Sequence, residues 1–379
     1  MLPFQKRSFR LLHLVLLVLS SVLLAACAAT EGPQSTFVAR GSSAQAILNL
    51  NNVLLVVAAG VFFIVEGMLV YSVVRFRRRP DDGIPLQIHG NKPIEIAWTI
   101  VPAIIVLFLA TMTFRTQAML AQPATNPLRV TVIGHQWWWE FQYPDYNVVT
   151  ANELHIPANR DIQLTLESVD VIHSFWIPQL AGKTDVVPGH VNTMTIRADD
   201  TAQPILIRGQ CAEYCGGTHA QMNMFAVVEP QATFDSWIRQ QQAAAPVPAG
   251  VTQAATAEPG ATAEAATATA VPPAPAANTQ AGGPVAQGYA LFQQKGCVGC
   301  HTIQGYPNAA GKLGPNLTHV GSRQHIVAGW LQNTPDNMRR WLRDPNEVKP
   351  DNYMGTAIKR GTLNENEITA LTAYLESLK

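Results

Sequence analysis

Two cysteines, a histidine and a methionine share one short segment whose side chains are suited to binding copper. The segment reads Cys211-Ala212-Glu213-Tyr214-Cys215-Gly216-Gly217-Thr218-His219-Ala220-Gln221-Met222. Thiolate, imidazole and thioether groups are soft ligands that together favour copper. His173 supplies a second imidazole, and the backbone carbonyl of Glu213 is a further donor. A mononuclear blue-copper site needs one cysteine and two histidines, so two bridging thiolates indicate two copper ions that share an electron.

The same residues allow two simpler interpretations. Cys211 and Cys215 could form a structural disulfide, or they could bind zinc together with the histidines. Zinc prefers tetrahedral sites of cysteine and histidine, and methionine is a poor ligand for it. The Cys-x3-Cys spacing alone is weak evidence, but His219, Met222 and the upstream His173 favour the dinuclear copper interpretation.

A second metal-related motif lies near the C-terminus, in Cys297-Val298-Gly299-Cys300-His301. Cys-x-x-Cys-His is the attachment signature of a c-type haem. Cys27 is the remaining cysteine of the five in the chain, and it falls at the end of an N-terminal targeting segment. These assignments leave no cysteine for a structural disulfide, and they place both cofactor sites outside the cytoplasm.

The composition indicates a membrane protein. The 26 Lys and Arg balance the 26 Asp and Glu, which argues against nucleic acid as a main partner. Only 14% of the residues are charged and 47% are hydrophobic, which is a low charge content for a soluble protein.

The N-terminus has the features of a bacterial lipoprotein signal. Lys6, Arg7 and Arg10 form a basic region, and an apolar stretch runs over 11–24. Small residues then precede Cys27. We expect a signal peptide over 1–26 and a lipid on the Cys27 sulfur, the alternative being an ordinary membrane helix.

Two long apolar runs follow, at about 47–76 and 94–119, and each is long enough to span a bilayer. Arginines after the first run place the connecting loop in the cytoplasm and both chain ends outside. Glu66 and Glu95 lie in or near these spans, and ionisable groups there are functional candidates. Glu95 follows Pro93, so it could equally be an interfacial helix cap.

From Leu128 to about Glu229 the pattern changes to short alternating segments separated by Pro, Gly, Asn and Asp. We expect strands at 128–133, 161–166, 191–196 and 204–207, which predict a β-sandwich or Greek-key barrel. Residues 240–287 are rich in Ala, Pro, Thr and Gly and predict a tether. Beyond it, helix candidates lie at 288–292, 338–342 and 365–378.

The copper segment, the hairpin and the β domain together resemble subunit II of cytochrome c oxidase, over about Ala46 to Gln231. The second membrane run, Ile94-Glu95-Ile96-Ala97-Trp98-Thr99-Ile100-Val101-Pro102-Ala103-Ile104-Ile105, and the aromatic segment Gly134-His135-Gln136-Trp137-Trp138-Trp139 also carry the resemblance. The tail from about Gln287 resembles a fused class I cytochrome c domain.

The resemblance implies a multidomain fold: a two-helix transmembrane hairpin, an all-β cupredoxin-like Greek-key barrel and a small all-α cytochrome c domain. The expected boundaries are 1–26 for the signal peptide, 27–121 for the N-terminal segment and hairpin, 122–236 for the copper A domain, 237–286 for the linker and 287–379 for the cytochrome c domain.

The resemblance also implies roles for individual residues of the copper domain. His173, Cys211, Cys215, His219 and Met222 are implied to bind two copper ions, as copper A, through their side chains. Glu213 is implied to bind copper through its backbone carbonyl and to face a magnesium ion shared with the catalytic subunit. Trp137 is implied to be the relay where electrons enter, and Glu95 to be the acid of a proton pathway.

For the haem domain, Cys297 and Cys300 are implied to hold haem c covalently and His301 to be its proximal ligand, with its imidazole bonded to Pro315. A distal methionine is expected. Met338 falls in a helical pattern beside Trp341 and has the character of a core residue, whereas Met354 lies in a loop. We therefore expect Met354 to be the ligand. A proline usually follows this methionine, and Gly355 stands there instead. We expect His319 and His325 to be surface residues rather than ligands.

The implied function is electron transfer from the chain's own haem c to copper A, and on to subunit I, where oxygen is reduced to water. The implied partners are subunits I and III, an external cytochrome c or other donor, and the bacterial cell membrane, with the copper and haem domains on its outer face. No oxygen site is expected on this chain itself.

Three other classes share parts of this pattern. A nitrous oxide reductase-like module usually has Trp at the position of Glu213 and lacks the hairpin. A copper assembly or storage protein needs neither a haem nor an aromatic relay. A quinol oxidase subunit of the same fold has lost the copper ligands, which are complete in this sequence.

Overall fold

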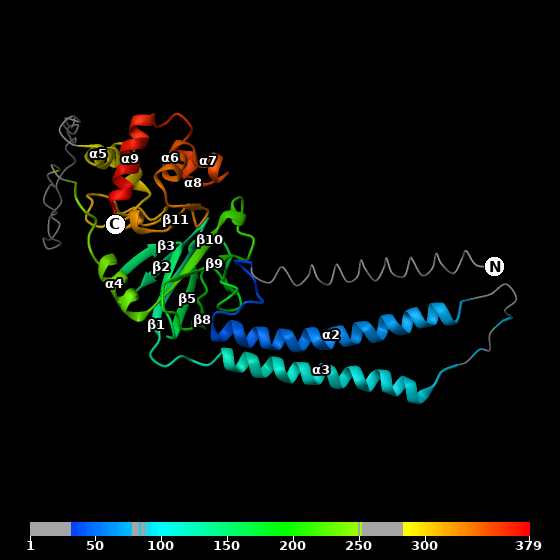
Figure 1. Ribbon diagram of the computed structural model, residues 1–379. Helices are drawn as coiled ribbons and strands as arrows, with labels where there is room; N and C mark the ends of the chain where they lie inside the picture. The colour runs from blue at the N-terminus through cyan, green and yellow to red at the C-terminus, as the bar shows by residue number, and fades with distance from the viewer. Residues whose placement is uncertain (1–31, 78–82, 85–86, 88, 249–250, 252–282) are drawn as a thin grey trace. The chain divides into compact units, whose positions relative to one another are not determined.

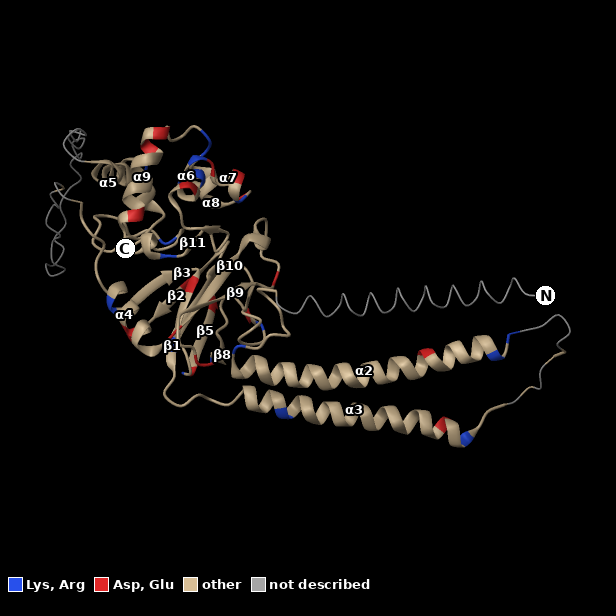
Figure 2. Ribbon diagram, in the orientation of Figure 1, with Lys and Arg blue, Asp and Glu red and all other residues tan. Residues whose placement is uncertain are grey.

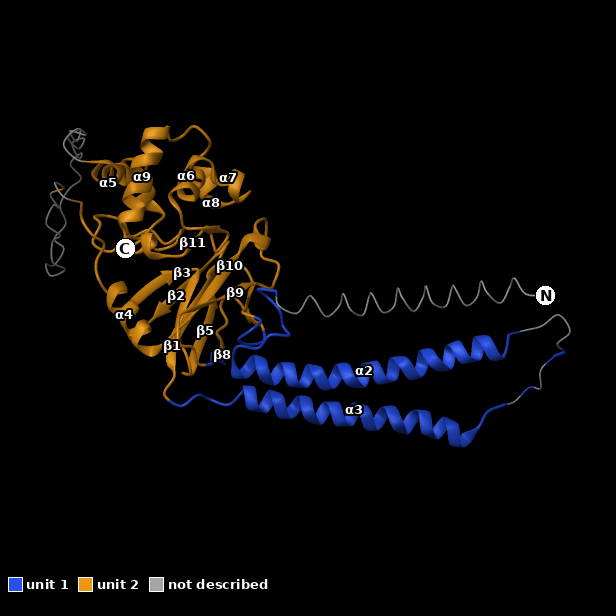
Figure 3. Ribbon diagram, in the orientation of Figure 1, with its two compact units in different colours: residues 1–125, 178–182, 195–199 blue, residues 126–177, 183–194, 200–379 orange. Residues whose placement is uncertain are grey.

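The computed structural model describes residues 32–77, 83–84, 87, 89–248, 251 and 283–379 (Figure 1). The expected signal peptide, the lipidation candidate Cys27 and most of the expected linker lie outside the described residues. The chain divides into two compact units (Figure 3). Unit 1 comprises 1–125, 178–182 and 195–199, and unit 2 comprises 126–177, 183–194 and 200–379.

Unit 1 contains two long apolar helices, α2 (Ser42–Arg75) and α3 (Lys92–Leu120). Their 34 and 29 residues give lengths that exceed the hydrocarbon core of a bilayer, about 30 Å. Large apolar side chains are exposed along them, such as Phe63 at 71% and Leu107 at 69%. Figure 2 shows that charged residues lie toward the helix ends. Both helices therefore match the predicted membrane spans by length and composition.

Unit 2 begins with two five-stranded sheets. One has the order β3-β2-β1-β5-β8 and the other β4-β10-β9-β6-β7. The strands are β1 (Leu128–His135), β2 (Trp138–Tyr143), β3 (Val148–Ala151), β4 (Glu153–Pro157), β5 (Ile162–Ser168), β6 (His173–Trp176), β7 (Thr184–Val186), β8 (Asn192–Ile196), β9 (Ile205–Cys211) and β10 (Asn223–Glu229). β1 and β5 pair in parallel, as do β4 and β10.

The alternating sequence pattern explains this sandwich. In β1, Leu128, Val130 and Val132 are buried, while the residues between them are more exposed. Aromatic rings then join the two sheets, because Phe175 of β6 meets Trp139 of β2 edge to face with ring centroids 5.6 Å apart. The predicted β-sandwich is confirmed, and all four expected strands are present.

A helix, α4 (Gln231–Gln241), follows the last strand. It extends five residues into the segment expected to be linker. Phe234 and Ile238 are buried on one side of it, and Trp237 stacks on His155 with ring centroids 4.0 Å apart. The helix forms because these apolar side chains have a surface of the sheet to cover.

The C-terminal part of unit 2 is helical, as expected. Its helices are α5 (Pro284–Gln294), α6 (Pro335–Arg343), α7 (Pro345–Val348), α8 (Tyr353–Ala357) and α9 (Glu365–Ser377), with the short elements η3 (Cys297–Gly299), η4 (Val320–Ser322), β11 (His325–Ile326) and β12 (Leu331–Gln332). One cluster of buried side chains forms its core, including Phe292, Met338, Leu371 and Tyr374. A capping box formed by Asn364 and Glu367 begins α9.

Gly288 of α5 allows this helix to pack closely against α9. A Cβ atom at this position would overlap the Ala370 carbonyl and lie 2.6 Å from the Tyr374 Cβ. We expect Gly288→Ala to lower the free energy of unfolding of the haem domain by about 1–3 kcal/mol through overpacking. Gly283→Ala, where a Cβ meets nothing within 4 Å, is the matched control. Equal denaturant midpoints for the two variants would contradict this packing argument.

Candidate metal and haem sites

The predicted copper ligands converge at one end of the second sheet. His173 is the first residue of β6 and Cys211 the last of β9, and the strands pair with Phe175 opposite Cys211. The loop after Cys211 returns through a short turn, η2 (His219–Gln221), to Met222. The Cys211 amide donates to the Met222 carbonyl at 2.9 Å, which closes the loop at its base.

The donor atoms form a compact cluster. The Sγ atoms of Cys211 and Cys215 are 3.8 Å apart and both thiols are free. Cys211 Sγ lies 3.9 Å from His173 Nδ1 and 3.2 Å from the Glu213 carbonyl oxygen. Cys215 Sγ lies 3.5 Å from His219 Nδ1 and 3.7 Å from Met222 Sδ. Each thiol therefore faces one imidazole and one weaker donor.

The charges of the two thiols fit a cationic occupant. A hydrogen bond from the Cys215 thiol lowers the pKa of Cys211. The same interaction raises the pKa of Cys215, because a second negative charge beside the first is unfavourable. Positive metal charge removes this repulsion and allows both thiols to ionise. The donor set thus fits copper by ligand type and by charge.

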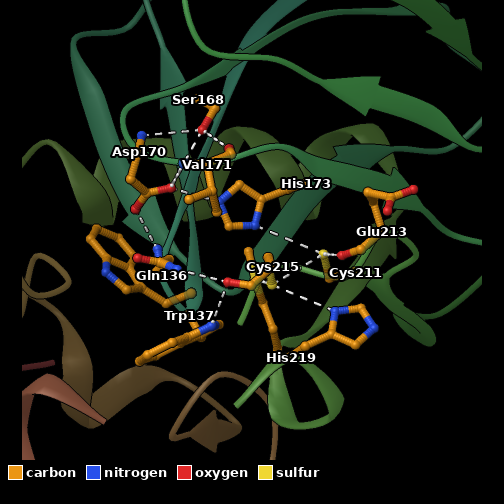
Figure 4. Close-up of polar contacts among 12 residues, drawn as sticks. Gln136, Trp137, Ser168, Asp170, Val171, His173, Cys211, Glu213, Cys215 and His219 are labelled. Carbon is orange, nitrogen blue, oxygen red and sulfur yellow. Dashed lines mark hydrogen bonds and ion pairs between the residues drawn. The ribbon is translucent and has the colours of Figure 1, made fainter. Parts of the chain in front are cut away.

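An acidic side chain that sequence reasoning missed orients His173. Asp170 Oδ1 lies 2.8 Å from His173 Nε2, on the opposite side of the ring from Cys211 (Figure 4). Burial raises the pKa of Asp170, but hydrogen bonds from His173 and from the Val171 and Gln136 amides outweigh it and keep the pKa low. A carboxylate here fixes the tautomer that leaves Nδ1 free for metal.

Trp137 contacts the copper loop directly. Its Nε1 donates to the Cys215 carbonyl at 3.0 Å, and Gln136 Nε2 donates to the same oxygen at 2.7 Å (Figure 4). Gly216 has φ +114°, and a Cβ there would lie 3.2 Å from Trp137 Cζ2. The glycine therefore permits both the loop conformation and the approach of the indole ring.

The haem-attachment residues line one cavity. Cys297, Cys300 and His301 lie on its wall together with both candidate methionines, Met338 and Met354. His301 Nδ1 donates to the Pro315 carbonyl at 2.8 Å, and burial lowers the pKa of this histidine. A neutral imidazole with Nδ1 engaged leaves Nε2 as the available ligand atom. An apolar cavity with this histidine and two cysteines fits a covalent haem.

The structure explains the glycine after Met354. The expectation that Met354 lies in a loop was wrong, because Met354 is half-buried in the short helix α8, while Met338 is buried in α6 within the domain core. Asn346 Nδ2 donates to the Gly355 carbonyl at 3.0 Å, and a Cβ on Gly355 would overlap the Asn346 side chain. Gly355 therefore holds the α8 turn against α7 where the usual pattern has proline.

Two histidines of the haem-site region, His319 and His325, lie outside the ligand set. His319 is only 4% exposed and faces the Ala243 carbonyl, so the expectation of a surface residue was wrong. The short apolar segments around it fold inward and carry it into the domain. His325 is partly buried, stacks on Phe225 and lies 3.6 Å from Glu153.

The two remaining predicted site residues are both glutamates, Glu95 of unit 1 and Glu213 of the copper loop. Glu95 is in the first turn of α3, where its carboxylate accepts the Asn91 amide at 3.1 Å. It therefore caps the helix, the simpler of its two interpretations. The Glu213 side chain is exposed and directed away from the cysteines (Figure 4).

Comparisons with known families match most of the chain. Residues 29–116 match the transmembrane domain of cytochrome c oxidase subunit II, 147–229 match its periplasmic domain, and 285–379 match cytochrome c. The copper cluster falls in the second match and the haem motif in the third, while Trp137 lies between the first two. The chain belongs to the cytochrome c oxidase subunit II family, in a form with a C-terminal cytochrome c domain.

Individual relatives agree with this assignment. Cytochrome c oxidase subunit 2 of Alkalihalophilus pseudofirmus is 32% identical over 90% of this chain and 89% of its own. The subunit 2 of Bacillus sp. (strain PS3) is 36% identical over 80% of each. The periplasmic domain of subunit II of cytochrome oxidase of Bradyrhizobium japonicum is 29% identical over 32% of this chain and 97% of its own, with a TM-score of 0.30. The assignment rests on the sequence matches.

Gly134 gives a prediction for the copper site. A Cβ here would lie 2.7 Å from His173 Cδ2 and 3.1 Å from Cγ, so the residue reserves space for the imidazole ring. We expect Gly134→Ala to displace this ring and to weaken copper binding by on the order of tenfold or more, measured by competition with a chelator. Gly32→Ala, with nothing near its Cβ, is the control. Unchanged copper affinity in Gly134→Ala would contradict the role assigned to His173.

Proposed function

We propose that this chain is the electron-transfer subunit II of a membrane-bound cytochrome c oxidase. It takes electrons through its own haem c to a dinuclear copper A centre and on to the catalytic subunit I, where oxygen is reduced to water. The proposal is supported mainly by one observation: a chain of this family holds both a cluster of two thiols and a histidine and a Cys-x-x-Cys-His cavity in one compact unit.

Each cofactor has a defined set of residues. Two copper ions are held by the side chains of His173, Cys211, Cys215, His219 and Met222 and by the Glu213 carbonyl. Haem c is held by Cys297, Cys300, His301 and Met354. When bound, these groups supply reversible one-electron chemistry. The Glu213 carboxylate faces a magnesium ion shared with subunit I, and its exposure leaves it free to do so.

The protein residues keep the ligands fixed while charge changes. Asp170 holds His173, and the Pro315 carbonyl holds His301, so neither imidazole reorients. A backbone hydrogen bond from Cys211 to Met222 closes the base of the loop. Such rigidity limits the structural change that accompanies each electron, which favours fast transfer at low driving force.

In the assembled oxidase, this chain contacts other subunits, an electron donor and the membrane. Subunits I and III bind the membrane helices, and an external cytochrome c or other carrier supplies electrons. We infer a bacterial cell membrane, with the copper and haem domains on the outer face and Cys27 lipidated after removal of 1–26. Trp137 is the electron-entry relay to the copper loop. Glu95 caps α3 and also serves as the acid of a proton pathway.

The proposal is tested by electron transfer within the full-length protein loaded with copper and haem. After rapid addition of less than one equivalent of reductant, we expect haem absorption to show reduction first. The haem should then reoxidise as the copper absorption bleaches. Cys215→Ser should leave the haem reduced, whereas Cys27→Ser should behave as the unsubstituted protein. A haem that stays reduced in the unsubstituted protein would contradict the proposed function.

The distal haem ligand has its own test. Methionine ligation raises the haem potential. We expect Met354→Ala to lower the midpoint potential by on the order of 100 mV, measured by spectroelectrochemical titration. Met338→Ala should affect domain stability more than the potential, because Met338 is a core residue. The reverse pattern would move the ligand to Met338.

A further inference from the structure

Within unit 2, the domain with the haem motif contacts the domain with the copper cluster through specific groups. We call residues 126–177, 183–194 and 200–241 the copper-site domain and residues 283–379 the haem-site domain. Their contacts include two buried ionisable side chains, Lys349 and Glu153, and one aromatic stack, between Tyr353 and Trp137. The sequence motifs assigned no function to Lys349, Glu153 or Tyr353.

Lys349 of the haem-site domain ends in the copper-site domain. Its side chain is 4% exposed, and Nζ donates to the Trp137 carbonyl at 2.6 Å and to the Gln221 carbonyl at 3.3 Å. Burial lowers its pKa to about 7. Burying an amine is costly without such partners, so the two carbonyls define one position for this side chain. Both acceptors adjoin the copper loop.

Glu153 of β4 makes the reciprocal contact. It is 2% exposed, and its Oε1 accepts the backbone amides of Gln324 and His325 at 2.9 and 2.8 Å. His155 faces its other oxygen at 3.9 Å, and Glu229 faces His155 at 3.4 Å. A carboxylate that is buried needs such donors, and the two backbone amides come from the other domain. The docked arrangement therefore satisfies groups that separation would expose.

An aromatic contact lies between the two cofactor sites. The Tyr353 ring stacks on Trp137 with centroids 5.4 Å apart and planes at 23°, and its hydroxyl donates to Gln136 Oε1 at 3.0 Å. Trp137 and Gln136 both donate to the Cys215 carbonyl. Tyr353 also directly precedes Met354 in the chain. One peptide bond, one ring stack and one hydrogen bond thus connect a proposed haem ligand with a proposed copper ligand.

We propose that Tyr353 is the positioning residue that couples the haem site to Trp137. In this proposal, Lys349 and Glu153 hold the haem-site and copper-site domains in the relative position that the contact between Tyr353 and Trp137 needs. The proposal rests on the proposed function. Neither ring is oxidised in this role: one electron leaves a reduced haem, one electron reaches the oxidised copper pair, and the rings provide the contact between them.

Variants of Tyr353 test the contact in the full-length protein loaded with copper and haem. We expect Tyr353→Leu to slow haem-to-copper transfer by on the order of tenfold or more, because the stack is lost. Both midpoint potentials and amide hydrogen exchange at Leu371 in the haem-site core should stay unchanged. Tyr353→Phe keeps the stack and should retain most of the rate. Trp330→Leu, an exposed aromatic residue of the same domain, is the control.

Lys349 and Glu153, the two anchor residues between the domains, can be tested by hydrogen exchange, which does not depend on activity. We expect Lys349→Met and Glu153→Gln to speed hydrogen exchange at the Gln324 and His325 amides and to slow electron transfer. Lys359→Met, which removes an exposed lysine, should change neither.

Transfer at the unsubstituted rate in Tyr353→Leu would overturn the role of the stack. Unchanged amide exchange and an unchanged rate in both anchor variants would overturn the anchoring. These failures differ from failure of the proposed function, in which no electron reaches copper even in the unsubstituted protein.

Discussion

Two thiols whose sulfur atoms are 3.8 Å apart cannot both be negatively charged unless positive charge lies beside them. This constraint explains the organisation of the copper-site domain. β9 ends at Cys211 and β10 begins directly after Met222, so adjacent strands hold both ends of the loop. β6 brings His173 to the same edge of the sheet. The sandwich thus holds a cluster of donor atoms that metal ions would complete, and metal binding would then be linked to folding of this loop.

The haem site, unlike the copper cluster, does not depend on neighbouring charges. His301 is neutral and held by a carbonyl, and the cavity wall around it is largely apolar. Its two cysteines would need no neighbouring charge as the covalent attachment points of a haem. A buried interface of polar groups then connects this site with the copper loop. Because Trp137 is stacked by Tyr353, an external carrier that used this ring would have to displace the chain's own haem-site domain.

Patterns local in sequence were sufficient to predict much of this molecule. The copper loop and Cys-x-x-Cys-His carry their chemistry within a few residues, and the two apolar runs and the alternating strands have clear periodicity. Asp170 could have been found, since it lies three residues before His173, but carboxylates in turns are common. The helix α4 was not predicted, because the polar residues and alanines around the buried Phe234 and Ile238 obscure its apolar side.

Other features depend on contacts between distant residues and leave no local signal. Lys349 and Trp137 are separated by 212 positions, and Glu153 and His325 by 172. A lysine beside a proline and a glutamate in a strand have the character of surface residues, and only the folded arrangement buries them. The need for glycine at position 134 likewise arises from a ring that belongs to β6.

The most direct test of this account is electron paramagnetic resonance of the copper-loaded full-length chain. Replacing both Cys297 and Cys300 with serine prevents covalent haem attachment, so that copper alone contributes to the spectrum. The account predicts hyperfine structure from one unpaired electron shared equally by two copper nuclei. A spectrum of a single copper, or zinc bound with no signal, would contradict it.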